Sequence, residues 1–168
     1  MRSDGTIVLV GQRDTVGVFE EYDPDELGQE SVIRKGSLPS SDVRAGAVDA
    51  ADRVYLAGAT DNPAFPVTNA VQGDQPGRDA FVARFTADGV REFLTCLGGE
   101  NTDETNALGV ATNNEIVVAG TTNSRNFPNL NGPFRVKGLG YDAFVTKLDL
   151  ISGSGAAYAV AMSTLFGG

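Results

Sequence analysis

The sequence has no histidine, no tryptophan and a single cysteine, Cys96, among its 168 residues. Without histidine, the side chain that most often transfers protons near neutral pH is missing, which excludes the commonest route to acid–base catalysis. One cysteine can form neither an internal disulfide nor a cysteine-based zinc site. We therefore expect Cys96 to be a small buried apolar side chain and not a nucleophile.

Positive charge and long apolar runs are also scarce. The 13 Lys and Arg residues face 22 Asp and Glu residues, which gives a formal charge of −9. Nucleic-acid binding needs clustered Lys and Arg, so we expect no nucleic-acid partner. No apolar stretch approaches the roughly 18 residues of a membrane helix, and the N-terminal stretch does not have the pattern of a signal peptide. The sequence predicts no membrane span and carries no targeting signal.

Glycine is abundant, with 21 residues, and hydrophobic residues make up 41% of the chain. The apolar runs are short, rich in Val, Ile, Phe and Thr, and bounded by Gly, Asn and Asp. Such runs are typical of β-strands joined by tight turns, because Asn, Asp and Gly tolerate positive φ. The fold class that we predict is therefore all-β.

An internal repeat supports this prediction. The stretch "DRVYLAGATDNPAFP" (52–66) aligns with "NEIVVAGTTNSRNFP" (114–128) at an offset of 62 positions. The string D-A-F-V begins at Asp79 and again at Asp142. Each repeat reads as four short strands, here called A to D, and four antiparallel strands repeating about every 60 residues are typical of a β-propeller blade.

The repeat divides the chain into about three blades: an incomplete blade over residues 1–42 and two blades over residues 43–104 and 105–168. The first copy contains only strands B, C and D. A propeller normally needs about four to eight blades to close its ring. We expect a fragment of a larger propeller whose other blades are its partners; assembly as an oligomer and an open three-blade stack are the alternatives.

The motifs of the repeat are D-A-F-V, L-G-G, V-A-G-T and F-P, and together they resemble the SBBP repeat, the seven-bladed β-propeller repeat of bacterial surface and secreted proteins. The resemblance covers most of Val43 to Gly168. The first copy departs from it, because F-P and D-A-F-V are missing there. The resemblance implies a propeller, an extracellular or cell-surface location, and no catalytic residues.

Loop length indicates where a ligand would bind. In a blade the A–B and C–D turns lie at one end, and the B–C and D–A connectors lie at the other. The first set is tight and the second is long, so the long-loop end is the candidate functional face. The candidate ligand-binding residues there are Asp61, Asn62, Asp103, Glu104, Asn123, Arg125 and Asn126. As an alternative, Asp and Asn in such loops cap turns through bonds to the backbone.

Three further expectations concern repeated or acidic residues of these loops. Asp79 and Asp142, at the start of strand C, are expected to make a blade-to-blade hydrogen bond. Phe65 and Phe127, in the F-P motifs, are expected to hold the long loop on the blade. Glu100 with Asp103 and Glu104 could bind calcium, although the spacing of a calcium loop is missing; we otherwise expect no cofactor.

The function that we predict is a non-enzymatic module that serves as a scaffold or binds a protein or a glycan. The alternative is a propeller enzyme, a hydrolase or lyase, with carboxylates and a metal at the long-loop end. An enzyme would need residues unique to one blade, and the unique charged residues Arg125 and Lys137 look scattered. Strand C of the last blade is expected to place Phe144 and Leu148 on one side of the sheet.

Overall fold

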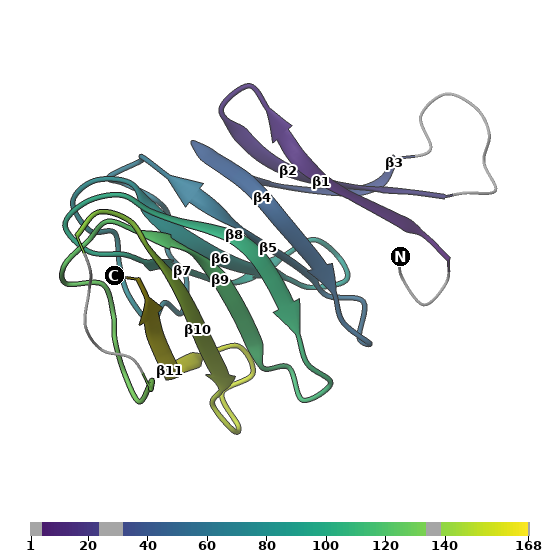
Figure 1. Ribbon diagram of the computed structural model, residues 1–168. Coiled ribbons are helices and arrows are strands. Elements are labelled where there is room, and N and C mark those ends of the chain that lie inside the picture. Colours follow the sequence, from purple (N-terminus) through teal and green to yellow (C-terminus); the bar gives the residue numbers. More distant parts are fainter. Residues whose placement is uncertain (1–4, 24–31, 134–138, 168) are drawn as a thin grey trace.

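A computed structural model describes residues 5–23, 32–133 and 139–167. Within these ranges the chain forms eleven β-strands and no helix, so the all-β prediction is confirmed. The strands form three antiparallel sheets, which lie one after another across the molecule (Figure 1). None of the described residues belongs to a helix that could cross a membrane.

Each sheet is a meander, in which strands that follow one another in the chain are paired. The first sheet contains β1 (Ile7–Arg13), β2 (Val16–Tyr22) and β3 (Val32–Leu38). The second contains β4 (Ser41–Val48), β5 (Val54–Thr60), β6 (Asp79–Phe85) and β7 (Arg91–Leu97). The third contains β8 (Asp103–Val110), β9 (Ile116–Thr122), β10 (Asp142–Leu150) and β11 (Tyr158–Phe166).

The first strand of each complete sheet begins earlier than its apolar residues suggest. Ser41 and Asp103 both start strands, two residues before the predicted blade starts at 43 and 105. Asp103 and Glu104 therefore lie in β8 and not in a connector, as the sequence had led us to expect. They belong to the strand because their backbones pair with Thr122 and Thr121 of β9.

The turns follow the expected chemistry. Asp52 and Asn114 occupy equivalent places in the β4–β5 and β8–β9 turns and have φ of 58° and 65°. Gly89 has φ of 80° in the β6–β7 turn. These residue types populate the left-handed region at little energetic cost, so they allow the tight connections.

The middle sheet is covered on both faces, whereas the third is covered on one. All seven residues of β6 are buried, but burial alternates along β10. One hydrophobic core lies between the first and second sheets and includes Phe19 and Phe81. The other lies between the second and third sheets and includes Phe93 and Phe144. The sheets thus stack as layers.

The aromatic residues of the repeat behave as predicted. Phe65 and Phe127 are both 4% exposed. Their rings lie against Phe81 and Phe144 of strand C, with centroid distances of 5.3 Å and 4.5 Å. Phe144 and Leu148 are both buried, as expected of side chains on one side of β10. The long loops are thus held on their sheets by aromatic contacts.

The glycine of the V-A-G-T motif lies opposite a β-bulge in the neighbouring strand. Strand β4 is bulged between Val43 and Ala45, and β8 between Thr105 and Ala107. Beside each bulge a backbone carbonyl lies close to a glycine of the neighbouring strand: a Cβ atom at Gly58 would overlap the carbonyl oxygen of Asp42. Gly120 stands in the same relation to the bulge of β8. A residue with a side chain would force these strands apart.

Candidate functional site

The connectors collect at two ends of the molecule, and each end carries a pocket. A pocket of about 380 Å³ lies at the tight-turn end, between the β4–β5 and β8–β9 turns. A pocket of about 440 Å³ lies at the long-loop end, between the first and second sheets. The polar side chains that line it are Gln12, Thr15, Ser40, Ser41, Asp42, Asp61, Asn62 and Arg78. The long-loop pocket is the candidate functional site.

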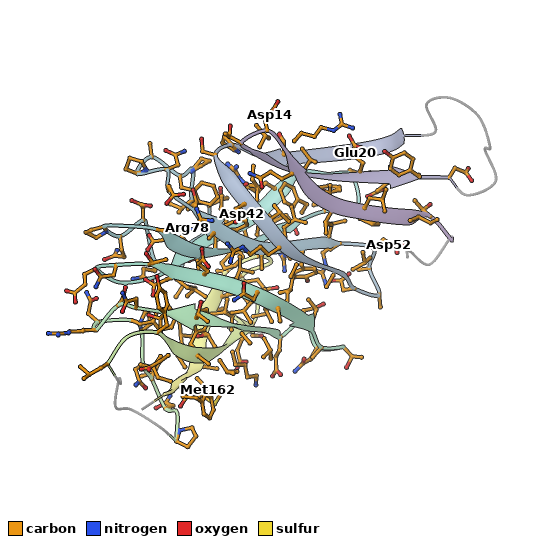
Figure 2. The ribbon with its side chains drawn as sticks, turned by 45° about the horizontal axis from the view of Figure 1, so that its top comes forward. Asp14, Glu20, Asp42, Asp52, Arg78 and Met162 are labelled. Carbon is orange, nitrogen blue, oxygen red and sulfur yellow. The ribbon has the colours of Figure 1, made fainter. Side chains whose placement is uncertain are left out.

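Arg78 organises this site from the residue just before β6. Its Nη2 atom lies 2.7 Å from Oδ2 of Asp42 in β4, and the two residues are adjacent in Figure 2. Its Nε atom lies 2.8 Å from Oε1 of Glu104 in β8, and its Nη1 atom pairs with Asp61. One planar guanidinium thus joins three carboxylates from three segments, a role that its fixed fork of donors suits.

A second arginine strengthens the network. Nη1 of Arg44 lies 2.7 Å from Oε2 of Glu104, and its Nη2 lies 2.9 Å from Asp42. The hydrogen bonds from Arg44, followed by those from Arg78, lower the pKa of Glu104. The hydrogen bond to Glu104 in turn raises the pKa of Arg44. Glu104 and Arg44 therefore remain charged at neutral pH, and the network ties the second sheet to the third.

Asp61 and Asn62, two of the candidate ligand-binding residues, both line the pocket. Asp61 is exposed to solvent, and its carboxylate forms an ion pair with Arg78. The Oδ1 atom of Asn62 accepts a hydrogen bond of 3.0 Å from the amide of Ala64, so Asn62 also caps a turn. The two predicted roles of Asn62 are therefore compatible, since its amide nitrogen is not used in that bond.

Asp103, Asn123 and Asn126 lie apart from the pocket, where the β7–β8 connector meets the β9–β10 loop. Oδ2 of Asp103 accepts hydrogen bonds from the Gly99 amide at 2.8 Å and the Ser124 hydroxyl at 2.7 Å. Oδ1 of Asn126 accepts one from the Glu100 amide at 2.8 Å. The side chain of Asn126 thus joins two loops, since Glu100 belongs to the β7–β8 connector and Asn126 to the β9–β10 loop.

The remaining candidates do not join this site. Asn123 bonds through its backbone, and its carbonyl oxygen accepts a hydrogen bond of 3.3 Å from Nδ2 of Asn101. Arg125 is exposed in the β9–β10 loop. Lys137 lies outside the described residues. The structure therefore groups Asp61 and Asn62 with Glu104, and separates the other four candidates from them.

The calcium hypothesis for Glu100, Asp103 and Glu104 is wrong on geometric grounds. Neighbouring residues of a strand point to opposite faces of the sheet. Asp103 is fully buried and bonded to Ser124, whereas Glu104 is bonded to arginines. Their oxygens do not converge, which a calcium site with six to eight oxygen ligands requires.

A buried acidic group near β6 was not foreseen. One ligand atom each from Asp74, Asp79 and Cys96 lies within 4.8 Å of the others. Oδ2 of Asp79 accepts a hydrogen bond of 2.5 Å from the amide of Gln75. The blade-to-blade hydrogen bond predicted for Asp79 is therefore wrong, because its bond lies within the loop that leads into its own strand.

Burial decides the ionisation of this group. It raises the pKa of Asp79 to about 7, raises that of Asp74, and raises that of the Cys96 thiol to about 12. Cys96 is buried and neutral, as expected from the sequence. Metals bind deprotonated ligands, so this group is better suited to share a proton between two carboxyl groups than to hold a cation. The group of Asp74, Asp79 and Cys96 could not be predicted from the sequence, because Cys96 comes close to Asp79 only through the pairing of β7 with β6.

Comparison with known proteins does not assign the chain to a family. No family model matches the chain, and no curated protein matches it.

Proposed function

We propose that the chain is a partial β-propeller whose three sheets are successive blades, and that it acts as a non-enzymatic module. In this proposal it serves as a scaffold and binds a protein or a glycan in the long-loop pocket. The resemblance to the SBBP repeat extends the proposal to a bacterial secreted or cell-surface setting. That resemblance and that location remain predictions.

The outer face of the third sheet supports the propeller. Residues of the second sheet that pack against the third are apolar, namely Tyr55, Ala57, Ala80 and Val82. The equivalent residues of the third sheet are also apolar but point outwards, namely Val117, Ala119, Ala143 and Val145. An exposed face that repeats the pattern of a buried one fits a further blade as its partner.

The observation that carries the binding proposal is the Arg78 network. It fixes Asp42 and Asp61 in one geometry at the wall of the pocket, beside the amide of Asn62 and the side chain of Gln12. Preorganised donors and acceptors lose little conformational entropy when a ligand binds. A wall of hydroxyl, amide and carboxylate groups matches the hydroxyl groups of a sugar or the polar backbone of a loop.

A glycan array followed by calorimetry tests the glycan arm, and capture of candidate surface proteins tests the protein arm. We expect Asn62→Ala and Gln12→Ala to weaken binding by about tenfold each, a typical effect of losing a ligand hydrogen bond. The control is Thr112→Ala in the tight-turn pocket, which should bind like the wild type. If no ligand binds, only the scaffold role is left.

The enzyme alternative has one observation in its favour. The pKa of Asp79, raised to about 7 by burial, lies in the range of a general acid. However, Asp79 is 0% exposed, so its carboxyl group does not reach solvent. Hydrolysis of chromogenic glycosides by the wild type that disappears in the Asp79→Asn variant would establish the enzyme alternative. We expect that neither the wild type nor the variant hydrolyses them.

A further inference from the structure

The pocket at the tight-turn end lies at the opposite end of the molecule from the Arg78 network. It encloses about 380 Å³ between the β4–β5 and β8–β9 turns, so the second and third sheets form it together. Sites for small molecules have volumes of roughly 300–1,000 Å³. The apolar side of the pocket consists of alanines of the two turns with Val48 and Val110, and its polar side consists of Asp49, Arg53, Thr112 and Asn114.

Two charged residues of this pocket depart from the internal repeat. At the offset of 62 positions, Asp49 aligns with Ala111, and Arg53 aligns with Glu115. The β8–β9 turn forms without an aspartate and an arginine at these places, so a turn of this kind does not require them. The pair of Asp49 and Arg53 is therefore particular to this one place in the molecule.

Asp49 holds the side chain of Arg53 and has no hydrogen-bonding capacity left for a ligand. Its Oδ1 atom accepts hydrogen bonds from the amides of Ala51 and Arg53, at 2.9 Å and 3.1 Å. Its Oδ2 atom accepts one from Nε of Arg53 at 2.7 Å and one from the hydroxyl of the buried Tyr55 at 2.8 Å. A carboxylate accepts about four hydrogen bonds, so all of its positions are taken.

The polar side chains that remain for a ligand carry donors. Arg53 uses Nε for Asp49 and Nη2 for Oδ1 of Asn114, and its Nη1 atom has no hydrogen-bond partner among the described residues. The Nδ2 atom of Asn114 and the hydroxyl of Thr112 also have none within the described part of the chain. A pocket whose acceptor is used and whose donors are free suits an anionic group.

Two other arginines show how many carboxylates a guanidinium accepts in this molecule. Arg78 pairs with three and Arg44 with two, whereas among the described residues Arg53 pairs with Asp49 alone. A ligand carboxylate at Nη1 of Arg53 would form a charge-assisted hydrogen bond, which is about twice as strong as a neutral one. A short apolar group attached to that carboxylate would cover the apolar side of the pocket and gain from its burial.

We propose that the tight-turn pocket binds a carboxylate with a short apolar substituent. Arg53 is its charged partner, and Asn114 and Thr112 are further donors. A free aliphatic acid and the C-terminal residue of a peptide share this chemistry. The site is separate from the long-loop pocket and binds its ligand whether or not that pocket binds another.

Titration of the isotope-labelled complete chain with N-acetylvaline, followed by NMR, tests the proposal. We expect amide shifts confined to the β4–β5 and β8–β9 turns. N-acetylvalinamide, in which a neutral amide replaces the carboxylate, should bind at least about tenfold more weakly. Isobutyrate distinguishes the two sources of the carboxylate. Binding as tight as that of N-acetylvaline identifies a free acid, and weaker binding identifies the C-terminal residue of a peptide.

Three variants examine the residues of the pocket. Arg53→Gln should weaken the binding of N-acetylvaline at least about tenfold. The matched control is Arg91→Gln, which removes the same charge at the start of β7, outside the pocket, and should bind like the wild type. Asn114→Asp should fold normally, because Asp52 has the equivalent place in its turn with a similar φ. Its carboxylate should repel the ligand and weaken binding.

Several outcomes would overturn the proposal. They are equal binding of N-acetylvaline and its amide, shifts that lie outside the two turns, and an Arg53→Gln variant that binds like the wild type. Equal losses in Arg53→Gln and Arg91→Gln would assign the binding to net charge and would overturn it as well. If Arg53→Gln does not fold, Asn114→Asp decides, and unchanged binding by that variant would overturn the proposal.

Discussion

Among single residues, the buried carboxyl group of Asp79 imposes the strongest constraint on its surroundings. Its Oδ1 atom is buried without a hydrogen-bond partner and lies where a Cβ atom of residue 98 would be, which is why the L-G-G motif needs Gly98. An ionised carboxylate in such a place is poorly solvated. The two motifs D-A-F-V and L-G-G are therefore one structural unit, in which the aspartate of the first requires the glycine of the second.

The ionisation of Asp79 predicts how stability depends on pH. An aspartate of an unfolded chain titrates near 3.9, and burial raises the pKa of Asp79 to about 7. The folded state thus binds the proton more tightly, so the stabilisation is complete below about pH 4 and is lost as pH rises to about 7. The shift corresponds to at most about 4 kcal/mol.

Urea unfolding between pH 4 and 8 measures this effect. Asp79→Asn should flatten the decline and should be more stable than the wild type at pH 8, since its amide oxygen can still accept the Gln75 hydrogen bond. Asp88→Asn removes an exposed carboxylate and is the control. A decline that persists unchanged in Asp79→Asn would assign it to another group.

At the scale of elements, the internal repeat allows the order and approximate positions of the strands to be predicted from the sequence. The order of strands and their turns follow from local residue types, because alternation and turn propensity act over a few positions. The early starts of β4 and β8 were missed because polar residues such as Asp103 and Glu104 do not look like strand residues. The partners of Arg78 were also missed. Asp42 lies 36 positions away and meets Arg78 only when the second sheet forms, and Glu104 lies 26 positions away and meets it only when the second and third sheets stack.

The bulged strands give a prediction for a single methyl group. Gly58→Ala would place its Cβ atom on the carbonyl oxygen of Asp42, and we expect a loss of about 1–3 kcal/mol in the free energy of unfolding. Gly109→Ala in β8, where no atom lies within 4 Å, should change it by less than about 1 kcal/mol, in the stabilising direction. Chemical denaturation compares the two; equal effects would contradict the role of the bulge.

A buried arginine joins the second and third sheets. Arg84 in β6 is 0% exposed. It donates hydrogen bonds of 2.9 Å to the Tyr158 hydroxyl and 2.8 Å to the Gly155 carbonyl, and its Nε atom lies 3.0 Å from Glu92. We expect Arg84→Met to lose about 2–3 kcal/mol, because the buried partners remain without their donor.

The control for Arg84 is Lys147→Met, at the equivalent position of β10. Lys147 pairs with Glu115 and Asp149 at the surface, where ion pairs contribute little to stability. Thermal unfolding should show a large loss for Arg84→Met and little change for Lys147→Met. Similar losses in the two variants would mean that the contacts of Arg84 with the third sheet do not contribute to the stability of the fold.

The whole molecule is a stack with two unlike ends. Among the described residues β1 forms an edge of the first sheet, and the third sheet ends the stack with an apolar face that includes Val117 and Val145. Exposed apolar surface of this kind promotes association. The repeat in the sequence does not distinguish a covered face from an exposed one, because the residues on both are alike.

The open face predicts a change in self-association. Val117 is 39% exposed on the outer face of the third sheet, and Val117→Lys should lower the association constant measured by sedimentation equilibrium while leaving the melting temperature unchanged. Val90→Lys is the control, because Val90 is 62% exposed in the β6–β7 turn, away from that face. If both variants associate like the wild type, the outer face takes no part in self-association.

The separation of the two cores has a consequence for how the molecule opens. Each core lies between two sheets, so the loss of an outer sheet removes one core and leaves the other intact. Stability in such a stack is a sum over neighbouring interfaces, and unfolding can start from either end. Amide protons of β5 and β6 should then exchange with solvent most slowly, and those of the two outer sheets should exchange earlier and independently of each other.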